Sequence, residues 1–399
     1  MKKIRISELF VSLCFLAFLF GMMAATLLTE KEEESFFENR NLAAFPAYTA
    51  EADGDGSYIR ALEKYFTDHA ALREPLLRWK TEMDLVLERP VVNETVLSDG
   101  WFLPYLGYRQ ADREQTAADA EAMADNLAHI RDTTEEYGGH YCYVAVPNQY
   151  IYWAEAYPGY MDRAFVQEYL NLELLSAALA ERGVDFLDVG TAVEALGHPE
   201  GYMSRVDHHY TMEGAFLTYQ ILMEQLRAIT GEELPILREE DVTFETLPDP
   251  YLGSRARKLM GVVTSQEQVQ LLHPREEVPF TRQDNGADSP SQVYILPQEE
   301  EYVTYAVYMG GDVAQTTIQT HREELPSILI YGDSFTNALE CILYLSFDRM
   351  DALDLRYTNI SLTDYIQETQ PDYVVCLRDY SSLLVLSGNG GGEEDGSSD

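Results

Sequence analysis

Amphipathic helices alternate with short apolar strands through most of this chain. One helical pattern ends at Gly138-Gly139, and the uninterrupted apolar run Tyr141–Val146 follows it and predicts a buried strand. The same rhythm returns with a helix over 170–181 and a strand over 184–189. Near-continuous apolar strands between amphipathic helices are typical of a mainly parallel sheet covered on both faces, so we expect an α/β fold. Further predicted elements are two amphipathic helices over 58–89, a helix over 214–229, and strands over 328–331 and 373–377.

The longest apolar run lies at the N-terminus. Residues 9–28 carry no charge, basic residues precede them, and acidic residues follow. About 20 apolar residues span a bilayer, and a basic flank stays on the cytoplasmic side. We therefore expect residues 1–30 to be a single-pass transmembrane anchor in the cell membrane, with the rest of the chain outside the cytoplasm. A signal peptide cut near Ala25 is the alternative.

Composition divides the remaining sequence. Residues 31–57 read as a tether and residues 58–386 as the folded domain. Within that domain, residues 235–324 are charged and turn-rich with Tyr and Val runs, which predicts a β-rich insertion that includes a strand over 305–309. Residues 387–399 are rich in Gly and acidic residues and contain no large apolar residue, so we expect a disordered acidic tail.

The net charge argues against nucleic acid as a partner, and the cysteines argue against a disulfide framework. The chain has 28 basic and 68 acidic residues, and its net charge of -40 repels nucleic acid. Cys14 lies in the N-terminal apolar run, and the other three cysteines cannot all pair with one another. Cys142 and Cys376 fall in predicted strands and read as core residues. No disulfide framework, metal or cofactor is expected.

Ser334 is the first candidate for chemistry. A predicted strand leads into Gly332-Asp333-Ser334, and a helical pattern follows at once. A serine in such a turn lies at the positive end of the helix, where backbone amides can stabilise a negative oxygen. The structural alternative is a helix cap. The Gly-x-Ser-x-Gly elbow is absent, since Thr336 occupies the last glycine position.

The segment Asp207-His208-His209-Tyr210 offers the base that a serine nucleophile needs. Asp207 and His209 are two residues apart, so in an extended or turn-like segment the carboxylate can hold one ring nitrogen and leave the other to face Ser334. A purely local turn hydrogen bond is the alternative. A metal site at His208 and His209 is disfavoured, because neighbouring residues of an extended chain project to opposite sides and no second ligand cluster in the sequence has metal-site spacing.

These motifs resemble the DHHW proteins, named for an Asp-His-His-Trp motif, which are similar to the alginate O-acetyltransferases and to the wider SGNH hydrolase group. In the acetyltransferase relatives an Asp-x-His-Trp segment precedes a Gly-Asp-Ser segment, which permutes the usual SGNH order, and this chain has the same order. Tyr210 stands where the motif has tryptophan, and Asn148 stands where those relatives tend to have a basic residue. The segments that carry the resemblance are Glu38–Leu42 with Phe45-Pro46, Ser98–Phe102, Val146–Asn148, Asp207–Tyr210, Leu252–Ser254 and Tyr331–Thr336.

The resemblance implies an SGNH-hydrolase-like fold in which Ser334 is the nucleophile, His209 the base and Asp207 the residue that orients the base. SGNH enzymes take oxyanion donors from the serine amide, a glycine and an asparagine. Candidates for oxyanion or substrate binding are therefore Asn148, Gly310, Gly311, Asn337, Tyr210 and His208.

Together these features predict a serine-dependent O-acetyltransferase or acetylesterase, membrane-anchored and extracytoplasmic. It would act on O-acetyl groups of a cell-envelope polysaccharide through an acyl-Ser334 intermediate. Acetyl-CoA is cytosolic, so a transferase would need a multispanning membrane protein to present acetyl groups outside, as the resemblance also implies. The alternative is a non-catalytic glycan-binding or envelope-assembly protein. Contact between His209 and Ser334 favours the enzyme.

Overall fold

A computed structural model describes residues 6–48, 57–107, 110–296 and 302–390. The chain separates into two compact units. Residues 1–95 and 256–263 form one, which we call the helical unit, and residues 96–255 and 264–399 form the other, the α/β unit.

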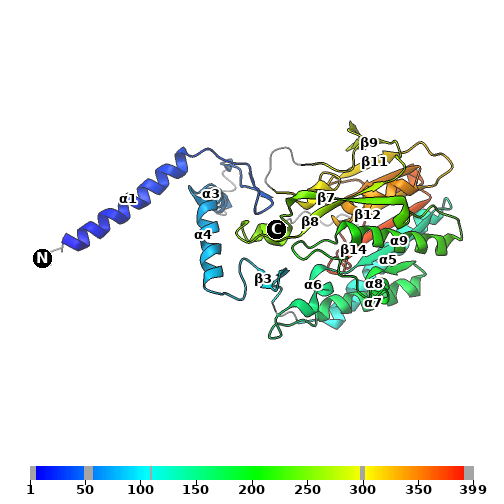
Figure 1. Ribbon diagram of the computed structural model, residues 1–399, viewed down its shortest axis with the longest axis horizontal. Coiled ribbons are helices and arrows are strands. Elements are labelled where there is room, and N and C mark those ends of the chain that lie inside the picture. The colour runs from blue at the N-terminus through cyan, green and yellow to red at the C-terminus, as the bar shows by residue number, and fades with distance from the viewer. Residues whose placement is uncertain (1–5, 49–56, 108–109, 297–301, 391–399) are drawn as a thin grey trace. The chain divides into compact units, whose positions relative to one another are not determined.

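An eight-stranded sheet is the centre of the α/β unit (Figure 1). Its order is β10-β9-β11-β13-β12-β14-β5-β6. The strands from β13 to β6 run parallel, and β11, β9 and β10 extend the sheet in antiparallel fashion beyond β13. The expected α/β fold with a mainly parallel sheet is confirmed. The strands are β5 (His140–Val146), β6 (Phe186–Asp188), β9 (Thr281–Asp284), β10 (Ala287–Ser289), β11 (Gln315–Gln319), β12 (Ser327–Gly332), β13 (Arg349–Leu353) and β14 (Tyr373–Asp379).

Strands β5, β12 and β14 lie next to one another and are almost wholly buried, which explains their unbroken apolar sequences. Strand β13 was not predicted, because Arg349 and Asp351 interrupt its apolar run. In the structure these two side chains form an ion pair at 2.8 Å, and Thr317 on β11 donates a hydrogen bond to Asp351 at 2.7 Å. Pairing with β12 and β11 therefore overrides the polar pattern.

Helices flank the sheet. α5 packs against α7 and α12, and α9 packs against α8 and α11. Asp112 caps α5 by accepting hydrogen bonds from two backbone amides, and Thr211 caps α9 by accepting one from Gly214. The helices are α5 (Arg113–Glu135), α6 (Gln149–Tyr152), α7 (Val166–Arg182), α8 (Val189–Ala195), α9 (Met212–Thr230), α11 (Phe335–Leu343) and α12 (Leu362–Thr369), and the short α10 (Ser254–Lys258) crosses a boundary between the units.

The predicted insertion over 235–324 contains strands, as expected, but part of it belongs to the main sheet. In the described part of the chain, β7 (Val242–Pro250) and β8 (Gln268–Pro274) form a separate two-stranded sheet, whereas β9, β10 and β11 extend the central sheet. The predicted strand over 305–309 is wrong. Tyr305–Val307 form a 3-10 turn, in which the Tyr308 amide bonds back to the Tyr305 carbonyl at 3.1 Å.

The helical unit begins with α1 (Ile6–Leu28). Residues 9–28 have a mean hydropathy of 2.3, and among the described residues α1 is the one helix long and apolar enough to cross a membrane. α3 (Ser57–Asp68) and α4 (Arg73–Val86) are the two helices predicted over 58–89. Among the described residues, the remaining strands form two short hairpins, β1 (Glu34–Ser35) with β2 (Arg40–Asn41), and β3 (Thr95–Ser98) with β4 (Trp101–Pro104), of which β4 belongs to the α/β unit.

Ion pairs join the β1–β2 hairpin to the helices that follow. Arg40 bonds to Asp68 at 2.6 Å, and Glu38 pairs with Arg73 at 2.6 Å. The hydrogen bond from Arg40 lowers the pKa of the buried Asp68 to about 2. The described part of the predicted tether is therefore folded against α3 and α4.

The start of the predicted tail is also folded. The side chain of Asn389 is fully buried; it accepts a hydrogen bond from the Tyr143 hydroxyl at 3.1 Å and donates one to the Val385 carbonyl at 2.6 Å. The fold thus extends to residue 390, and the rest of the predicted tail, residues 391–399, lies outside the described residues.

Candidate active site

Ser334 lies where β12 ends and α11 begins, at the carboxyl edge of the parallel strands. Gly332 makes this turn possible, since a Cβ there would lie 2.1 Å from the carbonyl oxygen of Leu377 on β14. Asp333 accepts a hydrogen bond from the Phe335 amide at 3.0 Å, which fixes the first turn of the helix. In open parallel sheets this edge is the usual position of a ligand site.

His209 connects Ser334 to Asp207. Its Nε2 lies 2.7 Å from the Ser334 Oγ, and its Nδ1 lies 2.6 Å from an Asp207 carboxylate oxygen. His209 and Asp207 are 3% and 2% exposed, so water competes little for these contacts. The predicted meeting of the histidine and serine segments, 125 residues apart, is confirmed. The three side chains can pass a proton from the serine hydroxyl to the imidazole.

The local backbone holds Asp207 as a carboxylate. One of its oxygens accepts a hydrogen bond from the His209 amide at 3.0 Å, and the other accepts one from the Ser254 amide at 2.5 Å. Burial by itself would raise the pKa of Asp207, but the interaction with the His209 side chain and the hydrogen bond from the Ser254 amide hold that pKa well below its usual value. Asp207 is therefore ionised at neutral pH.

Gly253 allows Ser254 to come this close. A Cβ on Gly253 would lie 2.5 Å from the carbonyl oxygen of Val206, so only glycine permits the two segments to touch. Ser254 also places its Oγ 2.7 Å from the Nδ1 of His208. The sequence motifs predicted no role for Ser254. Its presence in the Leu252–Ser254 motif was the only signal, because a Gly-Ser pair carries no chemistry by itself.

Aromatic rings enclose the imidazole. The ring of Tyr305 stacks on His209 with centroids 3.6 Å apart and planes at 6°, and the ring of Phe335 meets it edge-on at 5.0 Å. The Tyr210 hydroxyl donates to the Phe335 carbonyl, so the tyrosine that replaces the motif's tryptophan has a partner. Sequence reasoning missed Tyr305, because it placed that residue in a strand. Its stacking on His209 comes from a contact distant in sequence.

His208 lies beside the base, with its ring centroid 3.7 Å from that of His209. Burial and the nearby charge of His209 lower the pKa of His208, which keeps it neutral. Among the described residues, Asp207, His208 and His209 form the one group that could hold a metal ion. However, both nitrogens of His209 already bond to Asp207 and Ser334, and the Nδ1 of His208 bonds to Ser254.

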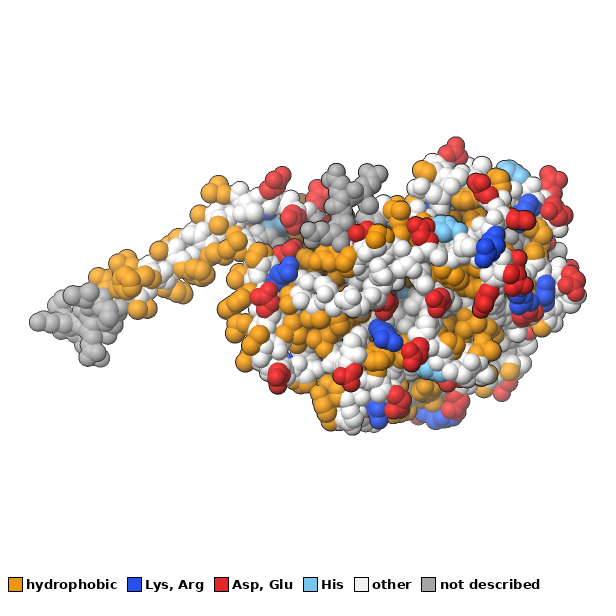
Figure 2. All heavy atoms as spheres, viewed as in Figure 1, with side chains coloured by type: hydrophobic (Ala, Val, Ile, Leu, Met, Phe, Trp, Pro, Cys, Tyr) orange, Lys and Arg blue, Asp and Glu red, His pale blue; other side chains and the backbone are white. Residues whose placement is uncertain are grey.

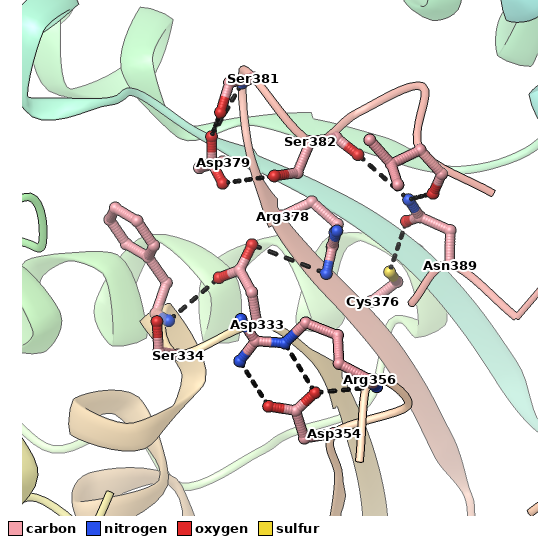
Figure 3. A network of polar contacts seen from close by, with 12 residues as sticks. Asp333, Ser334, Asp354, Arg356, Cys376, Arg378, Asp379, Ser381, Ser382 and Asn389 are labelled. Carbon is pink, nitrogen blue, oxygen red and sulfur yellow. Dashed lines mark hydrogen bonds and ion pairs between the residues drawn. The ribbon is translucent and has the colours of Figure 1, made fainter. Parts of the chain in front are cut away.

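A charged network continues behind Ser334 (Figure 3). Asp333 faces the buried guanidinium of Arg378 at 3.7 Å, and burial raises the pKa of Asp333 to about 6. Next to Arg378 on β14, Asp379 accepts hydrogen bonds from the Ser381 amide and the Ser382 hydroxyl, both at 2.8 Å. The side-chain amide of Asn148 also donates to Asp379.

Two of the other oxyanion candidates donate hydrogen bonds to groups outside the Asp207–His209–Ser334 series. The side-chain amide of Asn337 donates to Asp312 at 3.1 Å, and the Gly311 amide donates to the Tyr308 carbonyl at 3.0 Å. Gly310 has a φ of +88° in the same turn. The oxyanion roles of these residues and of Asn148 stay predictions.

A cavity of about 580 Å³ has Tyr305, the ring that stacks on His209, in its wall, whereas Asp207, His209 and Ser334 are not among its lining residues. Its size is within the range of small-molecule and sugar-sized sites. The rest of its wall includes the aromatic residues Phe102, Tyr210, Tyr251 and Tyr308, the acidic residues Glu200, Glu213 and Glu267, and Arg205.

A serine at the end of a central parallel strand, bonded to a His-Asp pair, is the arrangement of serine-dependent hydrolases and acyltransferases. The comparison with protein families agrees. The family described as "SGNH hydrolase-like domain, acetyltransferase AlgX" matches residues 96–303, which is more than half of the chain, so the protein belongs to this family. The match includes Asp207 and His209 and ends before Ser334.

Solved structures share the fold. Bacillus cereus PatB1, in a structure with a sulfonyl adduct, superimposes with a TM-score of 0.58 at 18% identity, covering 72% of this chain and 95% of that one. A DHHW family protein from Eubacterium siraeum superimposes with a TM-score of 0.55 at 19% identity, covering 75% of this chain and 95% of that one. No curated protein sequence matches. The expected SGNH-hydrolase-like fold and DHHW resemblance are confirmed.

Proposed function

We propose that this chain is an O-acetyltransferase that acts outside the cytoplasm on a cell-envelope polysaccharide through an acetyl-Ser334 intermediate. Membership of an acetyltransferase family supports the reaction class. The observation that carries the proposal is the continuous series of contacts from Asp207 through His209 to Ser334, at 2.6 and 2.7 Å. A protein that only binds glycans would need the sheet but not this series.

The chemistry follows in two balanced halves. The Ser334 Oγ attacks the carbonyl carbon of an acetyl donor while its proton passes to His209 Nε2, and Asp207 stabilises the imidazolium. The tetrahedral intermediate collapses to acetyl-Ser334, and the leaving group takes the proton from His209. A sugar hydroxyl then attacks the acetyl-enzyme, gives its proton to His209, and releases Ser334 with its hydrogen restored. Water in place of the sugar gives acetylesterase activity from the same residues.

The cavity that Tyr305 helps to line supports a glycan as the acceptor. Carboxylates such as Glu200 and Glu213 can accept hydrogen bonds from sugar hydroxyls, and tyrosine rings offer flat apolar faces to sugar C–H groups. The three glutamates of the wall outnumber its arginine, and the whole chain carries a net charge of -40. An anionic acceptor would be repelled, so a neutral or amino-bearing glycan is favoured.

The apolar helix α1 supports attachment to the membrane. We propose that residues 9–28 cross the bilayer once and leave the α/β unit outside. An acetyl donor must then be presented on that side, so the proposed partner is a multispanning membrane protein that passes acetyl groups outward. The residues described above need no cofactor for the two half-reactions.

Labelling and turnover of the full chain in detergent test the proposal. A PatB1 structure carries a sulfonyl adduct, so we choose an aryl sulfonyl fluoride as the probe, with p-nitrophenyl acetate as the donor. Ser334→Ala should lose the label and at least about 10³-fold of ester turnover. The matched control Ser176→Ala, on α7, should keep both.

Equal labelling of Ser334→Ala and the unmodified chain would remove Ser334 from the mechanism. Adding neutral, amino-bearing and uronate oligosaccharides to the donor reaction separates transfer from hydrolysis, because only transfer gives an acetylated sugar in mass spectrometry. Exclusive acetylation of the uronate would contradict the proposed acceptor.

A further inference from the structure

Helix α4 differs from an ordinary surface helix, because it buries polar side chains and exposes most of its large apolar ones. Two of its polar residues, Thr81 and Asp84, are 0% and 7% exposed. Thr81 accepts a hydrogen bond from the Asn93 side chain at 2.8 Å, while Lys80 and Arg89 pair with Asp84 at 2.8 and 2.9 Å. The buried side chains of α4 are therefore polar, and Leu77 and Leu85 on the same side are half-buried.

Large apolar side chains occupy the opposite side. Their spacing of three or four residues places them on one face, which we call the α4 apolar face. Exposure ranges from 43% for Met83 to 82% for Val86, and Trp79 at the centre is 59% exposed. The α4 apolar face consists of Leu72, Leu76, Trp79, Met83, Val86 and Leu87.

The exposed apolar surface is wider than this helix. Phe45, Ile59 and Phe66 in the same unit are also exposed. Figure 2 shows hydrophobic side chains gathered on the surface over α1 and α4. Between residues 45 and 87 there are as many exposed large hydrophobic side chains as in the described part of the whole α/β unit. A concentration of this kind marks a surface that meets an apolar partner.

The α4 apolar face starts beside the end of the proposed membrane span. The Ala71 amide donates a hydrogen bond to the Thr26 hydroxyl, in the last turns of α1, at 3.0 Å. Leu72, the first residue of the face, follows Ala71 directly. Within the helical unit the face therefore begins where residues 9–28 end.

We propose that the α4 apolar face lies in the interfacial layer of the bilayer that α1 crosses, an inference that rests on the proposed anchoring. A broad apolar surface with a central tryptophan suits a planar lipid surface better than the narrow groove of one partner helix. Lipid binding here is apolar rather than electrostatic, because the charges of α4 balance. The helix carries Arg73, Arg78 and Lys80 against Glu74, Glu82 and Asp84.

Site-directed spin labelling of the full chain in phosphatidylcholine vesicles tests this placement. Cys14→Ser removes the exposed native cysteine, and the other three are buried. Labels at Leu76→Cys and Trp79→Cys report the face, Glu82→Cys is a control on the same helix, and Phe15→Cys reports the span. We expect the two face positions to lose accessibility to a water-soluble nickel reagent and gain accessibility to oxygen, and Glu82→Cys to show the reverse, with no change between low and high salt.

Three results would overturn the proposal. Face labels as accessible to nickel as Glu82→Cys, with Phe15→Cys in the bilayer, would show that the face is in water. Face labels immobilised and shielded from both reagents would show that a protein covers it. An aqueous Phe15→Cys label would remove the anchor and with it this inference, whereas the enzyme proposal is judged separately by Ser334 labelling.

Discussion

The α/β unit and the α3–α4 helix pair use their apolar residues in opposite ways. In the α/β unit, Val144 and Leu175 are completely buried, and buried charged groups such as Asp207 gather beside Ser334. In α4 the buried residues are polar and Trp79 is exposed. Amphipathic spacing shows that a helix has two different environments. The contacts show which face of the helix packs against the protein. In α4 the apolar face points away from the protein.

The largest expected difference between the two regions is the effect of a buried carboxylate on ester turnover. Asp207→Asn should slow ester turnover by about 10²–10⁴-fold with the fold retained, because the imidazole loses its orienting charge. Asp84→Asn removes a buried carboxylate of α4 and should leave turnover unchanged. Steady-state kinetics with p-nitrophenyl acetate, beside circular dichroism, measure both. Equal turnover in the two variants would contradict the triad.

Leucine truncation compares the apolar residues directly. Leu175→Ala, at a site with 0% exposure on α7, should lower the free energy of unfolding by about 2–5 kcal/mol because it leaves a cavity. Leu76→Ala, at a site with 50% exposure, should change the free energy of unfolding by no more than about 0.5 kcal/mol. Urea unfolding without detergent, followed by circular dichroism, measures both variants. A loss at Leu76 as large as at Leu175 would mean that α4 packs its apolar face against protein.

The pH dependence of stability sharpens the contrast at Glu340 on α11. Burial raises the pKa of Glu340 to about 7 from an ordinary value of 4.5. The folded state therefore holds this proton more tightly than the unfolded state, and the stability that it contributes is complete below pH 4.5 and is lost as the pH rises through 7. Glutamine cannot ionise, so Glu340→Gln does not lose this stability. The free energy of unfolding of the variant, relative to that of the unmodified chain, should therefore rise by about 2 kcal/mol from pH 5 to pH 8.

Urea unfolding at both pH values measures this change, with the exposed Glu82→Gln as the control that should show no such gain. Parallel pH profiles for Glu340→Gln and the unmodified chain would show that Glu340 is not protonated in the folded protein near neutrality.

Much of the α/β unit could be predicted from the sequence. Strands β5, β12 and β14 are central and buried on both sides, so their sequences are unbroken apolar runs. The meeting of His209 and Ser334 was also predictable, since each motif specified the partner that it lacked. These features depend on local pattern or on paired chemistry, and both are visible in one sequence.

The features that were missed depend on contacts distant in sequence. Strand β13 is held by its neighbours although Arg349 and Asp351 break its pattern. Tyr305 belongs to a β-like run, but it turns to stack on His209. Ser254 reaches Asp207 only because Gly253 lets two backbones touch. No local periodicity encodes these approaches, so sequence patterns could not reveal them.

The position of β14 in the sheet has a consequence for biosynthesis. This strand, residues 373–379, lies between β12 and β5, and it alone joins β5 and β6 to the strands that lead to Ser334. It is the last of the described strands in the sequence, so the central sheet cannot be completed until residues 373–379 have been synthesised. In a nascent chain that is halted before residue 373, α9 could still pack against α11, but β5 and β6 would lack the strand that joins them to β12.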